Sequence, residues 1–152
     1  MDEIKRTVIA VKSSRYIALG LFSAFVFLFI IVLLWITYSI TKQLISLIVS
    51  ILPLVFFIIH TCMLSKELFR PKTAIKCYGD GIIINYAFGK KVDIKFADIT
   101  DFESHPVVGK WKVHDHGELF ITARGAVYNS GMIDDVRAVE KLLRSISAKY
   151  QR

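Results

Sequence analysis

The sequence offers few residues that could carry out chemistry, and the densest group is a short polar run in its C-terminal half. His114, Asp115, His116, Gly117 and Glu118 follow one another. Two histidines two positions apart can face one metal ion if the segment is a regular strand. The alternative is a plain turn, because Asp and Gly are common in turns and no third ligand lies at a suitable distance. We expect a turn at Asp115–Gly117 and no metal site.

Motifs of known enzyme classes are absent from the sequence. It contains no nucleophile elbow, P-loop, dinucleotide fingerprint or paired-carboxylate arrangement. We therefore expect a protein that is not an enzyme and that needs no cofactor.

Basic residues beside aromatic residues are the best candidates for ligand binding. A phosphorylated ligand favours Lys and Arg side chains, and it also favours aromatic rings if it carries bases. Three such groups stand at predicted turns: Lys90 and Lys91; Lys110, Trp111 and Lys112; and Arg124 through Tyr128. The last two are preferred, because each combines a cation with a large ring. The alternative for each group is a solvated surface, since Lys at turns and strand edges also prevents aggregation.

Short runs of β-branched and aromatic residues begin near Thr73 and are separated by Gly, Asp, Asn and Pro, which is the pattern of strands and turns. The candidate strands are 74–78, 82–86, 92–96, 99–103, 111–114, 118–122 and 126–128. An open flat sheet of about seven such strands would expose its edges, whereas a barrel or a pair of orthogonal sheets removes most of them. We expect a small antiparallel β-barrel within a cytosolic domain over residues 73–152.

An amphipathic helix over residues 134–150 is predicted to end the domain. Asp134 can cap its N-terminus, and Asp135 is favourable in the first turn. The apolar face repeats at helical spacing and consists of Val136, Val139, Leu142, Leu143, Ile146 and Tyr150. We expect this face to cap the open end of the barrel, because so small a domain has little other core.

The N-terminal half is much more apolar than the rest of the chain. Between Tyr16 and Met63, Lys42 is the only Lys, Arg, Asp or Glu. A helix needs about 20 apolar residues to cross the hydrocarbon core of a bilayer, and residues 17–40 and 44–63 both meet that need without an amphipathic stripe. We expect a two-helix transmembrane hairpin at residues 16–64, after a cytoplasmic N-terminal segment at residues 1–15.

The distribution of positive charge predicts that both termini are cytoplasmic. Lys and Arg are concentrated just before and just after the hairpin, and only Lys42 lies between the spans. A cleavable signal peptide fits less well, because the first apolar stretch is long and no small-residue cleavage site precedes the turn. The net charge of +7 reflects this excess near the lipid bilayer, so we expect no nucleic-acid polymer as a partner.

Small residues and a proline in the two spans indicate where helices could pack. They are Gly20 and Ala24 in the first span, and Ser46, Ser50 and Pro53 in the second. Pairs of small residues four positions apart let helices approach closely, and proline kinks or loosens a helix. The seams could join the two helices of one hairpin, or they could join several chains into a homo-oligomer.

Two resemblances follow from these features. The run Gly81–Ile84 followed by Val92–Ile99, in a small barrel with a C-terminal helix, is similar to the bacterial pleckstrin-homology-like domains of small membrane proteins. That resemblance covers residues 74–150. The layout of two spans and a minimal cytosolic β-barrel also resembles the membrane effectors of CBASS antiphage systems.

The second resemblance implies a function in antiviral defence. In that family the barrel responds to a cyclic nucleotide, and the spans then disrupt the inner (cytoplasmic) membrane. It implies that this chain is a membrane effector that senses a small anionic ligand such as a cyclic nucleotide, and that oligomerises. The alternative is a membrane-anchored pleckstrin-homology-like protein that acts as a bacteriocin self-immunity factor or as a scaffold.

Overall fold

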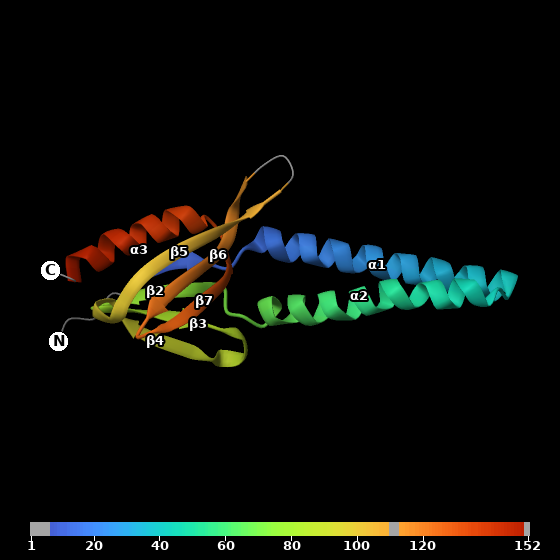
Figure 1. Cartoon of the computed structure of the whole chain (residues 1–152), viewed down its shortest axis with the longest axis horizontal. Helices are drawn as coiled ribbons and strands as arrows, with labels where there is room; N and C mark the ends of the chain where they lie inside the picture. The colour runs from blue at the N-terminus through green and yellow to red at the C-terminus, as the bar shows by residue number, and fades with distance from the viewer. Residues whose placement is uncertain (1–6, 110–112, 151–152) are drawn as a thin grey trace. The chain divides into compact units, whose positions relative to one another are not determined.

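The computed structural model describes residues 7–109 and 113–150, which form two compact units. One unit is a hairpin of two long helices, α1 (Ser14–Thr41) and α2 (Leu44–Leu68). The other is a β-sandwich with one helix, built from the residues that precede and follow the hairpin (Figure 1). The hairpin therefore interrupts the sandwich in sequence.

Both helices of the hairpin are long and apolar enough to span a membrane. Their most apolar segments have mean hydropathies of 3.0 and 2.5, and only 11% of each segment is buried. Core helices of soluble proteins are mostly buried, so these helices differ from them. At the connecting turn, Lys42 has a φ of 56°, and its N–H donates to the Tyr38 carbonyl oxygen at 2.8 Å. Both predicted helices are present, and the second extends five residues beyond its predicted end, from Met63 to Leu68.

Seven strands in the described residues form two antiparallel sheets. The first has the order β1-β2-β3-β4 and the second the order β5-β6-β7. Their bounds are Thr7–Val11 (β1), Thr73–Tyr78 (β2), Gly81–Asn85 (β3), Lys91–Lys95 (β4), Ile99–Val108 (β5), Val113–Ala123 (β6) and Ala126–Ile133 (β7). Short 3₁₀ turns at Ala87–Gly89 and Phe96–Asp98 lead into β4 and β5.

The sheets do not close into a barrel, so the expectation of a barrel was wrong. They are joined at one corner, where Lys12 forms a bridge with Ile133 and the Ser13 N–H donates to the Met132 carbonyl oxygen at 3.0 Å. At the other corner β4 and β5 are consecutive in sequence but belong to different sheets. Within the described residues β4 and β5 do not pair with each other, so the fold is an open sandwich of four and three strands.

The first strand was not foreseen from the sequence. β1 pairs with β2, although the whole hairpin separates the two strands in sequence. Thr7 lies opposite Cys77, and Val11 lies opposite Thr73. Part of the predicted N-terminal segment, residues 1–15, therefore belongs to the first sheet. The chain enters and leaves the hairpin from neighbouring strands.

β6 is continuous where the sequence predicted two strands separated by a turn. Asp115, His116 and Gly117 lie within β6, and Gly117 stands opposite Pro106 of β5. A Cβ atom built at Gly117 would lie only 2.6 Å from the Pro106 Cα atom. The glycine is required because two backbones approach closely at this point, so the predicted turn was wrong.

The core of the sandwich lies between the sheets and under α3 (Val136–Tyr150). Fully buried side chains come from both sheets, among them Ile75, Ile82, Ile84, Leu119 and Ile121, and Phe96 joins them from the 3₁₀ turn before β5. Of the predicted apolar face of the helix, Val136, Val139 and Leu143 are buried, whereas Leu142 and Tyr150 stay 46% and 47% exposed. The helix contacts β5, β6 and β1, so it covers both sheets.

The C-terminal helix begins slightly later than predicted. The carbonyl oxygen of Asp135 accepts a hydrogen bond from the Val139 N–H at 3.0 Å. Asp135 has a φ of 50° and directly precedes the helix. The residue at the cap is therefore Asp135, one position after the predicted Asp134.

Candidate functional site

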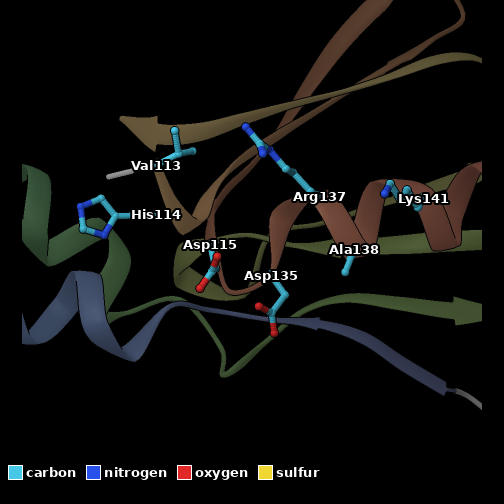
Figure 2. A pocket seen from close by; sticks show the side chains of 7 residues that line it. All are labelled: Val113, His114, Asp115, Asp135, Arg137, Ala138 and Lys141. Carbon is cyan, nitrogen blue, oxygen red and sulfur yellow. The ribbon is translucent and has the colours of Figure 1, made fainter. Parts of the chain in front are cut away.

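A pocket of about 320 Å³ lies between β6 and the start of α3 (Figure 2). Its volume is near the lower end of the range for small-molecule sites, roughly 300–1,000 Å³. The lining residues come from the strand and the helix: Val113, His114, Asp115, Asp135, Arg137, Ala138 and Lys141.

Charged side chains of both signs line this pocket. Arg137 and Lys141 are four positions apart on α3 and therefore share one face of the helix. Figure 2 shows the carboxylates of Asp115 and Asp135 pointing the same way, while the Arg137 side chain extends toward Val113. The four charged side chains are exposed, and none forms an ion pair within residues 7–109 and 113–150. The pocket can therefore bind an anionic group and hydrogen-bond donors at the same time.

The histidines of the polar run lie in β6. The rings of His114 and His116 are 5.1 Å apart between centroids, and His116 is buried. Across the described parts of the chain, no three His, Cys, Asp or Glu side chains are placed to hold a metal ion. Within this run, His114 and Asp115 are the residues that line the pocket.

The structure places the predicted binding residues away from this pocket or does not describe them. Arg124 lies at the turn between β6 and β7, where its Nη2 is 2.5 Å from Oδ2 of Asp98. Hydrogen bonding to that carboxylate raises the pKa of Arg124, and the guanidinium already has a partner. Tyr128 is half-buried and packs against the core. The remaining candidates lie outside the described residues: Lys110, Trp111 and Lys112.

The small residues of the predicted packing seams lie on inward positions of the hairpin. Gly20, Ser46 and Ser50 are buried. Ala24 and Pro53 are half-buried. A Cβ atom built at Gly20 would lie 2.7 Å from Cδ1 of Leu64. Gly20 thus lets α1 and α2 of one chain pack closely, and packing between chains stays a prediction.

A polar contact that the sequence analysis missed joins the two helices beside Gly20. The His60 Nε2 atom of α2 is 3.0 Å from the Gly20 carbonyl oxygen and 2.7 Å from the Ser23 Oγ atom of α1. The Ser23 hydroxyl donates to the same carbonyl at 2.9 Å. Because a carbonyl oxygen only accepts, Nε2 must carry the hydrogen for its bond to Gly20. No local pattern reveals this pair, since its members lie on different helices.

Arg144 of α3 covers the outer strand of the second sheet. Its guanidinium donates to the Phe102 carbonyl oxygen of β5, and it lies 2.9 Å from Asp101 and 2.8 Å from Glu140. Burial would raise the pKa of Glu140, but hydrogen bonds with Ser104 and Arg144 outweigh burial, and the pKa is lowered. The helix therefore protects an edge that could otherwise pair with another chain.

Comparison of the chain with protein-family models, with curated proteins and with solved structures finds no match.

Proposed function

We propose that this chain is a non-enzymatic membrane protein whose sandwich binds a small phosphorylated ligand in the β6–α3 pocket and transmits that binding to the hairpin. In this proposal α1 and α2 cross the inner membrane, and both termini lie in the cytoplasm. Ligand binding favours association of several hairpins, which perturbs the bilayer, as in antiphage defence. A ligand drives such a change only if it binds the two states with different affinity.

The observation that carries the proposal is the insertion of the hairpin between two paired strands. β1 ends three residues before α1 begins, and β2 follows α2 within a few residues. The Lys12 N–H donates to the Lys72 carbonyl oxygen at 2.9 Å, so the segments that enter and leave the hairpin are hydrogen-bonded to each other. Both helix ends are thus attached to one sheet. A rearrangement of that sheet changes the separation of the helix ends, and this supports a sensor rather than a passive anchor.

The mixed charges of the pocket favour a nucleotide over a simple anion. Phosphate oxygens can pair with Arg137 and Lys141. The carboxylates of Asp115 and Asp135 can accept hydrogen bonds from ribose hydroxyls or from the amino group of a base. A cyclic nucleotide carries all these groups, and it is also the ligand of the effectors that the layout resembles.

Calorimetry on the full chain in lipid nanodiscs, with a panel of cyclic di- and trinucleotides, tests this assignment. We expect one member of the panel to bind and Arg137→Glu to weaken its binding at least tenfold, because the change places a carboxylate among the ligand phosphates. Arg124→Gln is the matched control, since Arg124 pairs with Asp98 elsewhere on the sandwich. No binding across the panel would refute the ligand class. Loss of binding in Arg124→Gln alone would move the site to the β6–β7 turn.

Transmission to the hairpin has a separate readout. Cross-linking of the full chain in vesicles, with and without the bound nucleotide, should show larger oligomers and faster dye leakage when the ligand is present. Binding without any change in oligomer size or leakage would contradict the effector role and leave only a binding protein.

A constitutive interaction module is the second candidate, and an apolar groove favours it. The groove has a volume of about 410 Å³ and runs between β1 and the second half of α3, where its lining includes Val8, Leu142, Ile146 and Tyr150. An apolar segment of another protein could occupy this groove. In that case Leu142→Asp should abolish co-purification of a stoichiometric partner, and expression should raise tolerance to a membrane-active peptide without slowing growth.

A further inference from the structure

Two phenylalanines are stacked on the surface of the sandwich. Phe69 directly follows α2 and is 64% exposed, whereas Phe88 lies in the turn between β3 and β4 and is 77% exposed. Their ring centroids are 5.3 Å apart, and the ring planes are inclined by 30°. Single exposed apolar residues are common on proteins, but a stacked pair makes a continuous apolar patch.

The backbone of Phe88 adopts a conformation that is unusual for a bulky residue. Its φ of 58° and ψ of 29° place it in the left-handed region, which side chains with a Cβ atom rarely enter. Gly89 follows with a φ of 77° and has open space around it. A glycine at position 88 would form the same turn without strain. Strain kept at an exposed residue points to a role for its side chain.

The sandwich holds the two phenylalanines in place. Arg70 is buried, and its Nε atom donates to the Asn85 carbonyl oxygen at 3.1 Å. The Asn85 side chain donates in turn to the Thr73 carbonyl oxygen at 2.9 Å. These hydrogen bonds join the residues after α2 to the end of β3, next to the turn that carries Phe88.

Three exposed lysines lie close in sequence to the two phenylalanines. Lys72, Lys90 and Lys91 are exposed, and the segments Phe69–Tyr78 and Gly81–Val92 contain no Asp or Glu. We name the group formed by Phe69, Phe88, Lys90 and Lys91 the Phe-Lys turn. Lysines on the edge strand β4 also prevent aggregation, but that role does not explain the exposed rings.

Chain connectivity places the Phe-Lys turn close to lipid headgroups if α2 spans the bilayer. The 25 residues of α2 make a helix about 37 Å long at 1.5 Å per residue, which exceeds the hydrocarbon core of about 30 Å. The end of α2 therefore reaches the headgroup layer, and Phe69 is the next residue.

We infer that the Phe-Lys turn is a contact between the sandwich and the membrane surface that selects anionic lipid. The Phe88 ring enters the interfacial layer, and Lys90 and Lys91 pair with lipid phosphates. This contact requires the two helices to span the membrane, but it does not involve the β6–α3 pocket. It therefore stands or fails independently of the nucleotide ligand.

Depth-dependent quenching in proteoliposomes tests the contact on the full chain. A fluorophore on Ala87→Cys reports the turn, in a background of Cys62→Ser and Cys77→Ala. A fluorophore on Asp80→Cys reports the opposite end of β3 and is the matched control. With phosphatidylglycerol in the bilayer, headgroup-level quenching lipids should quench the probe at 87 strongly and the probe at 80 weakly.

Three variants identify the groups responsible. Replacing Lys90 or Lys91 with Gln should lower the ratio of membrane-bound to free turn about fivefold for each lysine in anionic vesicles, and the effect should vanish in pure phosphatidylcholine. Glycine suits the left-handed backbone at position 88, so the Phe88→Gly variant should fold. The probe at position 87 in this variant should nevertheless lose most of its quenching. Equal quenching at positions 87 and 80, or quenching at 87 that ignores both lipid charge and these variants, would overturn the proposal.

Discussion

Replacing Gly117 with alanine should destabilise the sandwich by about 2 kcal/mol. The added Cβ atom would lie 2.6 Å from the Pro106 Cα atom and would also collide with the His105 carbonyl group. Both obstacles are backbone atoms of β5, so the strands must separate locally. Overpacking of this kind costs about 1–3 kcal/mol, and a lost ladder hydrogen bond costs about 1 kcal/mol. Part of this loss is offset, because alanine leaves the unfolded chain less flexible than glycine does and so stabilises the folded state by about 0.5–1 kcal/mol.

Urea unfolding of the full chain in detergent micelles, followed by the labelling rate of the half-buried Cys77 thiol, measures this loss. Asp115→Ala is the control, since Asp115 is exposed on the same strand and should change stability by less than about 0.5 kcal/mol. If Asp115–Gly117 formed a turn, as the composition suggests, an alanine at 117 would meet no β5 backbone. Equal stabilities of the two variants would therefore refute the close approach of β5 and β6.

Three further changes probe the helix contacts. Glu140 has a lowered pKa, so its ion pair with Arg144 contributes stability above the ordinary glutamate range, near pH 4.3. Thermal unfolding should show Glu140→Gln less stable than the wild type at pH 7, and the gap should close as the pH falls through and below that range. His60→Leu should cost about 0.6–1.7 kcal/mol of hairpin stability through lost bonds to Gly20 and Ser23, measured by unfolding in mixed micelles, with Ser23→Ala costing less. Gly20→Leu should force the helices apart and reduce cross-linking between cysteines placed on α1 and α2, and unchanged cross-linking would contradict the packing at Gly20.

Features with a local sequence signal were predicted well. The two long helices and the C-terminal helix follow from runs and periodicities within single segments. The cap of that helix was misplaced by one position, because Asp134 and Asp135 are equally suitable by type.

Features that depend on pairing between distant segments were not predictable in this way. Thr7–Val11 has only a short strand-like pattern, and its partner β2 lies beyond the hairpin. Gly117 has the composition of a turn, yet its role depends on what β5 places opposite it. The alternation of seven strands did not reveal that the described strands would form two separate sheets.

The candidate site shows the same limit. Arg137 and Lys141 stand four positions apart in a helical segment, but only the pairing of distant segments brings Asp115 of β6 into the same pocket. Arg124 looked available as a ligand for an anion, and the pairing of β5 with β6 instead brings Asp98 against it. The presence of a basic residue and an aromatic residue at a turn does not indicate which carboxylate of another segment will pair with the basic residue.

The separation of β1 from β2 by the hairpin has a consequence for biogenesis. β1 leaves the ribosome first, yet it can pair only after both apolar helices and β2 have been synthesised. At about 5–20 residues per second, synthesis of the two helices and β2 after β1 takes several seconds, so the first sheet can form only after both helices have been made. Completion of that sheet thus reports that both helices have been made, and a chain whose second helix is misplaced would leave β1 without its neighbour and exposed to quality-control proteases.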